Sequence, residues 1–207
     1  MSYSDFTLDS LRHHFGIKVR EQHLYEKVGS IEPTAWLLEA LDKGRDLAFI
    51  SEKARSEFIV APVLMACRGV LGRPFRIFSG ARLDVDSDQG LKGECDFILA
   101  RSDSSYVIQA PLMVVLEAKK NDIEEGMGHC GAQMLGAREY NEIEGKRVPF
   151  LFGCVTTGES WQFLKLEGLD LVTHPVRFPI DRLGNILWFL VQCVREVADK
   201  ADSEVAA

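Results

Sequence analysis

The stretch Gly93-Glu94-Cys95-Asp96-Phe97-Ile98-Leu99, followed after a turn by Val114-Val115-Leu116-Glu117-Ala118-Lys119, decides the fold. Both runs are short, apolar and rich in strand-forming residues, which predicts two consecutive strands that lie beside each other in a sheet. Side chains alternate along a strand, so Glu117 and Lys119 project from the same face. Residues 112–116 are apolar on both faces, so the second strand is central and becomes polar only at its carboxyl end.

The segments on either side of these strands predict one α/β domain. Helix signals begin at Thr7, span Pro33 to Gly44, run from Ser51 to about Arg68 with a bend at Pro62, span 121–145, and run from Asp181 to about 198. Strand signals cover 75–79, 83–86, 94–100, 111–119 and 148–156, followed by a hairpin over 157–166. We therefore expect a restriction-endonuclease-like core, with a central mixed β-sheet flanked by helices.

The chain divides by pattern into three parts. Residues 1–50 are expected to form an N-terminal helical extension packed on the core, residues 51–200 the main domain, and residues 201–207 a disordered tail. The length of 207 residues suits one such domain.

Composition excludes several classes of protein. Lys and Arg number 24 against 31 Asp and Glu, a net charge of −7, which argues against a wholly basic nucleic-acid coat but not against a local basic groove. The five cysteines are scattered and form no C-x-x-C pair, which disfavours zinc fingers, iron–sulfur clusters and secreted disulfide scaffolds. The first residues are polar and no apolar run reaches ~18 residues, so we expect no membrane association and a cytoplasmic location.

The polar end of the central strand has the residue types of a metal site. Asp96 and Glu117 offer two hard oxygen ligands suited to Mg²⁺ or Mn²⁺, and Lys119 beside them can stabilise charge that builds on a phosphate. The alternative is a solvated strand end whose charges have no common purpose. Ligand sites in α/β sheets lie at such strand ends, which favours the metal site.

Asp96 followed by Glu117-Ala118-Lys119 resembles the motif of the PD-(D/E)XK nuclease superfamily, in particular the small standalone relatives of the type I restriction enzyme nuclease domain. Two further segments are similar to that group: residues 51–64, an acidic helix with an internal proline, and residues 156–168, a closing hairpin. The resemblance covers about 51–168. It departs from the superfamily at Cys95, where the name-giving proline would stand, and at Ala137, where some members carry a tyrosine.

This resemblance implies roles for individual residues. Asp96, Glu117 and the backbone carbonyl of Ala118 would hold Mg²⁺ or Mn²⁺, and Lys119 would serve the attacking water. A glutamine of the following helix commonly reaches the active site, and Gln133 is the matching position.

An acidic residue of the first helix would complete the site. Glu52 and Glu57 both qualify, and five residues apart on a helix they cannot point the same way; mid-helix Glu57 is the favoured choice. His129 shares a helix face with Gln133 and is expected to be a partly exposed helix residue.

Two surfaces are candidates for partners. Residues 66–82 contain Arg68, Arg73, Arg76 and Arg82 and no acidic residue, so they either track the phosphates of a nucleic acid, DNA foremost, or form a solvated loop. The last helix has an apolar surface wider than one packing face needs, which predicts either a homodimer or a helix fully covered by its own sheet.

The sequence thus predicts a Mg²⁺-dependent endonuclease that hydrolyses phosphodiester bonds, in DNA before RNA, in restriction, defence or repair. The alternative is a catalytically inactive nuclease-fold protein that acts as a protein-interaction or nucleic-acid-binding module.

Overall fold

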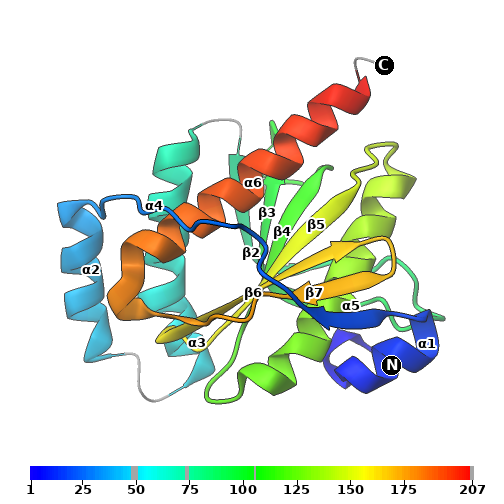
Figure 1. Ribbon diagram of the computed structural model, residues 1–207, viewed down its shortest axis with the longest axis horizontal. Coiled ribbons are helices and arrows are strands. Elements are labelled where there is room, and N and C mark those ends of the chain that lie inside the picture. Colours follow the sequence, from blue (N-terminus) through cyan, green and yellow to red (C-terminus); the bar gives the residue numbers. More distant parts are fainter. Residues whose placement is uncertain (48–50, 73–74, 105, 206–207) are drawn as a thin grey trace.

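A computed structural model of the chain describes residues 1–47, 51–72, 75–104 and 106–205 (Figure 1). The strands are β1 (Lys18–Glu21), β2 (Phe75–Arg82), β3 (Glu94–Arg101), β4 (Leu112–Ala118), β5 (Phe150–Thr156), β6 (Ser160–Glu167), β7 (Asp170–Thr173) and β8 (Phe178–Pro179). The helices are η1 (Tyr3–Asp5), α1 (Leu8–Phe15), α2 (Ala35–Arg45), α3 (Glu52–Arg55), η2 (Ser56–Val60), α4 (Ala61–Leu71), α5 (Ile123–Ile143), η3 (Ile180–Arg182) and α6 (Leu183–Val205).

All eight strands belong to one mixed sheet, with the order β1-β7-β6-β5-β4-β3-β2 and β8 also paired to β6. The pairs β4–β5 and β1–β7 are parallel, and the other pairs are antiparallel. Helix α5 makes the crossover between the parallel neighbours β4 and β5. Every residue of β4 and of β5 is buried, as their apolar sequences predict.

Helices cover both faces of this sheet (Figure 1). Neighbouring residues of β5 show it: the ring of Phe152 stacks on Tyr25, which packs against Phe189 of α6, whereas Gly153 faces Met134 of α5. A Cβ at Gly153 would lie 2.5 Å from the Met134 sulfur, so glycine lets α5 lie close to the sheet here. The sequence-predicted fold class, an α/β protein with a central mixed sheet flanked by helices, is confirmed.

The first helix of the main domain is continuous in the chain but changes its winding. Ser51 caps α3 by accepting the N–H of Ala54 at 3.1 Å, and residues 56–60 then form the π-helical turn η2. The N–H of Ala61 bonds the carbonyl of Ser56, five residues earlier, and Pro62 follows without an N–H of its own. The expected disturbance at Pro62 is therefore a widened turn just before it.

Residues 1–47 contain helices η1, α1 and α2, but they also supply a strand of the sheet. Strand β1 adds a parallel edge strand to the common sheet, and Tyr3, Phe6 and Leu11 are buried in the same core as the rest of the chain. Residues 48–50 lie outside the described residues. The N-terminal segment is thus part of one domain. The sequence did not predict this, because the strand Lys18–Glu21 is exposed and mostly charged.

Two other expectations need correction. Residues 83–86 form no strand but a loop with one bridge between Asp86 and Leu91. The expected tail beyond residue 200 is helical as far as Val205, and residues 206–207 lie outside the described part.

The apolar surface of α6 is covered within the chain. Ile186, Leu187, Phe189 and Leu190 are buried, and the Trp188 ring packs edge-on against Tyr25. The structure thus removes the argument for a homodimer through α6. Over the described ranges, no helix combines the length and apolar character that crossing a membrane requires.

Candidate metal centre

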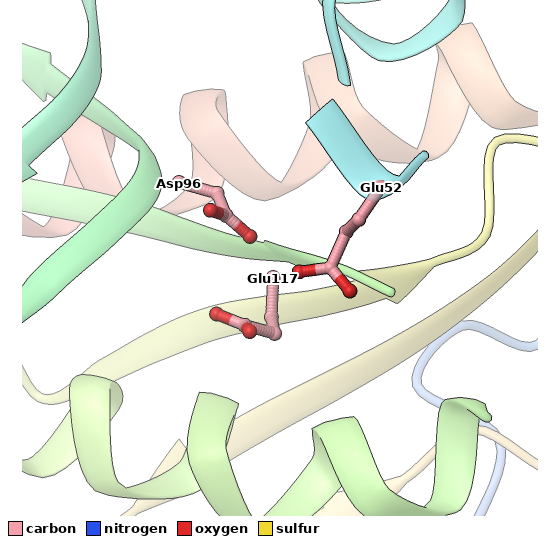
Figure 2. Close-up of side chains that lie close together, drawn as sticks. All are labelled: Glu52, Asp96 and Glu117. Atoms are coloured by element: carbon pink, nitrogen blue, oxygen red, sulfur yellow. The ribbon is translucent and has the colours of Figure 1, made fainter. Parts of the chain in front are cut away.

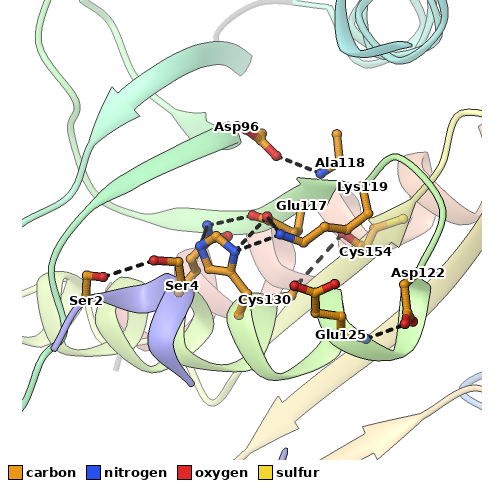
Figure 3. Close-up of polar contacts among 12 residues, drawn as sticks. Ser2, Ser4, Asp96, Glu117, Ala118, Lys119, Asp122, Glu125, Cys130 and Cys154 are labelled. Carbon is orange, nitrogen blue, oxygen red and sulfur yellow. Dashed lines mark hydrogen bonds and ion pairs between the residues drawn. The ribbon is translucent and has the colours of Figure 1, made fainter. Parts of the chain in front are cut away.

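Strands β3 and β4 bring their acidic residues to one end of the sheet. The antiparallel ladder ends at the pair Phe97 and Leu116, and the next residue on each strand is Asp96 and Glu117. The ladder does not continue there; instead Asp96 Oδ2 accepts the N–H of Ala118 at 2.7 Å (Figure 3). A side-chain carboxylate thus replaces a backbone acceptor at the strand end, which fixes Asp96 beside Glu117.

Glu117 is the most deeply buried acidic group of the site. Its side chain is 2% exposed, and its oxygens are bonded by three neighbouring side chains. Lys119 Nζ lies 3.0 Å and His129 Nδ1 2.7 Å from Oε1, and Gln133 Nε2 donates to Oε2 at 2.9 Å. Burial of a carboxylate is costly unless it is paired and hydrogen-bonded, and this one is both.

Asp96 has a strongly perturbed acidity. Burial is the main cause that raises the pKa of its carboxyl to about 6, and the neighbouring charge of Glu117 raises it further, against the lowering effect of the Ala118 N–H. A cation between these two carboxylates would relieve the repulsion of their negative charges and stabilise both in the ionised form.

A third carboxylate reaches the pair from helix α3. Oxygens of Glu52, Asp96 and Glu117 all lie within 4.8 Å of one another (Figure 2). Opposite ligands of one Mg²⁺ lie about 4.2 Å apart, so small side-chain shifts would close a shared shell. Three carboxylates form a hard oxygen set that fits Mg²⁺ or Mn²⁺ and does not fit soft metals.

The first-helix acid that joins the pair is Glu52, whereas the sequence favoured Glu57. Glu57 lies in η2 with its side chain 53% exposed, where it approaches Lys53 at 3.9 Å. Glu52 occupies the first turn of α3, and one turn later the buried Arg55 donates to the carbonyl of Thr157 at 2.8 Å. This bond fastens α3 to the turn between β5 and β6.

Lys119 continues β4 at the edge of the site (Figure 3). Its N–H donates to the carbonyl of Thr156 at 2.8 Å, and its side chain is 17% exposed. Burial alone would lower the pKa of Lys119, but the charge and hydrogen bond of Glu117 outweigh it, so the pKa is raised and the ammonium is charged. Alternation along the strand predicted this shared face with Glu117.

Helix α5 supplies Gln133, as predicted, and also His129, which the sequence placed at a partly exposed position. The His129 side chain is only 14% exposed and contacts Glu117 directly. The one sequence signal for it was its spacing of four residues from Gln133. At Ala118 the structure adds the N–H bond to Asp96, and the metal role of its carbonyl stays a prediction.

The three predicted arginines that the structure describes, Arg68, Arg76 and Arg82, do not gather beside the three carboxylates. Arg68 donates to the Phe75 carbonyl, and Arg76 lies opposite Ala100, four residues along β3 from Asp96, or about 13 Å. Arg82 lies opposite Glu94 at the site end of β2.

The charge of Arg82 is already paired: its guanidinium bonds both carboxylate oxygens of Asp84. Arg73 is outside the described residues.

No protein-family model, curated protein or solved structure matches this chain, so its function has to be argued from the site's own geometry.

Proposed function

We propose that this chain is a Mg²⁺- or Mn²⁺-dependent nuclease of the PD-(D/E)XK kind that hydrolyses phosphodiester bonds, in DNA before RNA. The observation that carries the proposal is the convergence of Glu52, Asp96 and Glu117 at one sheet end, with the Lys119 ammonium 3.0 Å from Glu117. Carboxylates from two strands and a helix can share a cation at their common point, and a lysine beside them suits an anionic substrate.

The residues divide the work of phosphodiester hydrolysis. Glu52, Asp96 and Glu117 would hold the metal, which supplies charge neutralisation and lowers the pKa of a bound water. Lys119 is charged and lies against Glu117, so it orients the attacking water and stabilises charge on the phosphate oxygens. Gln133 and His129 hold Glu117 from the side of α5.

One observation favours the alternative, a nuclease-fold protein without activity that binds a partner. The arginines at 68 and 76 lie away from the carboxylates and Arg82 is paired with Asp84, so the described residues of the predicted basic run form no groove at the site. Substrate contacts of an active enzyme would then come from Lys119 and from exposed Lys53 of α3. For either function we propose a cytoplasmic location, since all five cysteines are free thiols.

Because Glu52 joins the site and Glu57 does not, the two residues allow a matched test. Glu52→Gln and Asp96→Asn should lower Mn²⁺ affinity in calorimetry at least tenfold and abolish Mg²⁺-dependent cleavage of plasmid DNA. Glu57→Gln removes one acidic charge from the same helix and should leave both unchanged. Cleavage that persists in Glu52→Gln and Asp96→Asn refutes the metal site. Mn²⁺ binding without cleavage of DNA or RNA by the wild type supports the inactive module.

A further inference from the structure

Helix α5 holds the Glu117 carboxylate at two points. His129 Nδ1 lies 2.7 Å from Oε1, and Gln133 Nε2, one turn further along, donates to Oε2 at 2.9 Å. One bond to each oxygen fixes the rotation of the carboxylate about its last side-chain bond.

The contacts between the two α5 side chains determine which ring nitrogen of His129 carries the hydrogen. Gln133 Nε2 lies 3.2 Å from His129 Nε2, and an amide nitrogen is only a donor. His129 Nε2 therefore accepts, and the hydrogen on Nδ1 is donated to Glu117. Turning the amide round would place its oxygen against Glu117 Oε2, two acceptors in contact. Lys119 Nζ lies 3.4 Å from His129 Nδ1 and 3.0 Å from Glu117 Oε1, so the ammonium and the Nδ1 hydrogen share that oxygen.

This arrangement is retained at a cost. Both amide hydrogens of Gln133 are used, and its oxygen Oε1 is buried without a hydrogen-bond partner among the described residues. A buried oxygen without a partner destabilises a protein, and an apolar side chain would avoid that cost. A half-satisfied polar group of this kind is expected at functional sites.

The remaining acceptor capacity of Glu117 shows what the two-point contact achieves. A carboxylate has about four lone-pair positions. Among the residues that the structure describes, Oε1 accepts from both Lys119 and His129, whereas Oε2 accepts from Gln133 alone. Oε2 is thus the oxygen with a position left for a cation shared with Glu52 and Asp96.

We infer that His129 is a positioning residue that, with Gln133, orients Glu117 so that Oε2 faces the shared cation position while Oε1 keeps Lys119 beside it. The inference rests on the proposed function. Without the His129 ring, the Glu117 carboxylate can rotate toward the Lys119 ammonium, which then competes with the metal for both oxygens. Groups that orient a metal ligand typically change metal affinity or activity by 10- to 100-fold.

The test compares two substitutions at the same position. His129→Leu removes the donor, whereas His129→Asn keeps an N–H close to the place of Nδ1. We expect His129→Leu to weaken Mn²⁺ binding by about tenfold or more and to lower kcat with little change in KM for DNA, and His129→Asn to restore most of both. His13→Leu, a substitution of an exposed histidine on α1, is the control for surface effects.

Two readouts separate this inference from the proposed function. Nitrogen chemical shifts of the His129 ring in the metal-free protein should show the hydrogen on Nδ1; a hydrogen on Nε2 overturns the inference without reference to activity. Glu117→Gln is measured in parallel. If Glu117→Gln loses Mn²⁺ binding while a folded His129→Leu binds and cleaves like the wild type, only the positioning role fails. If Glu117→Gln also behaves like the wild type, the metal site and the positioning role fail together.

Discussion

Lys119 is the residue at which chemistry and stability can be separated. Lys119→Met keeps the aliphatic stem but removes the charge, and Glu117 retains its bonds from His129 and Gln133. We therefore expect a loss of about 1–2 kcal/mol in the free energy of unfolding. Turnover should fall about a hundredfold or more, because one aimed electrostatic group is lost at the reacting phosphate. Melting temperature, salt-matched DNA affinity and Mg²⁺-dependent cleavage are measured on this one variant. A folded, fully active Lys119→Met protein would show that Lys119 only pairs with Glu117 and has no role in catalysis.

Asp96 gives a prediction about pH. Its pKa is about 6 in the folded protein against 3.8 for the free group, so the folded state favours the protonated form. The stability that this adds is fully present below pH ~4 and is lost as the pH rises through about 6. A shift of two pKa units corresponds to about 3 kcal/mol before solvent screening.

Asp96→Asn should accordingly be more stable than the wild type at pH 8 in chelator, with the difference closing toward pH 4. Urea unfolding at both pH values measures it, and an equal difference at both would contradict the assigned pKa.

The residues of the site differ in how well their positions can be predicted from the sequence. Glu117 and Lys119 share a face because strand side chains alternate, and that rule needs no tertiary information. Glu52 could not be chosen over Glu57, because the choice depends on where Arg55 docks the helix on the β5–β6 turn. His129 was placed at a partly exposed position because helix spacing alone does not show which face meets a buried carboxylate.

At the scale of elements, α5 reaches the site because it approaches the sheet closely at Gly126. A Cβ there would lie 2.5 Å from Val155 Cγ1 and 3.0 Å from Lys119 Cγ. The Val155 side chain is branched and buried in β5, so it cannot easily move. Glycine at this position thus sets the distance between α5 and the ends of β4 and β5.

Gly126→Ala should therefore push α5 away from β4 and displace Lys119. We expect a loss of about 1–3 kcal/mol on unfolding, although alanine is the better helix former, together with a fall in cleavage larger than the fall in DNA binding. Gly145→Ala just after α5, where nothing lies near the added Cβ, tests backbone strain alone at its positive φ of 66°. A Gly126→Ala protein as stable and active as the wild type would show that α5 adjusts freely.

For the whole molecule, the sequence predicted the central strands and their flanking helices well. These segments carry their own signals: period-two or continuous apolar runs for β3, β4 and β5, and an apolar helical stripe for α6. The N-terminal strand β1 carries no such signal. All four of its residues are exposed, and three of them are charged, with Val19 as the one apolar residue. Its place is decided by pairing with β7, a contact between residues about 150 positions apart.

The N-terminal segment packs on α5, the helix that supports the site. Gly128 lies against the backbone of Phe6 and Thr7, Gly131 against the Leu11 side chain, and Gly136 against the Tyr3 hydroxyl. Tyr3 also donates to the Leu83 carbonyl at 2.8 Å. Removal of this segment would expose the face of α5 that carries these glycines. Glycine has no side chain, so nothing on α5 would shield this face from water.

Deletion of residues 1–16 should consequently destabilise the entire domain. Burial of Tyr3, Phe6 and Leu11 contributes about 2 kcal/mol for each side chain, which together approaches the 5–15 kcal/mol that holds a typical domain folded. We expect the truncated chain to be unfolded or to melt at least 10 °C lower, and to lose Mn²⁺ binding with it. His14→Ala in α1, an exposed position of the same segment, should stay within about 1 kcal/mol of the wild type. A truncated protein that melts like the full chain would restore the view of this segment as an extension, and α5 would then have to hold Glu117 without it.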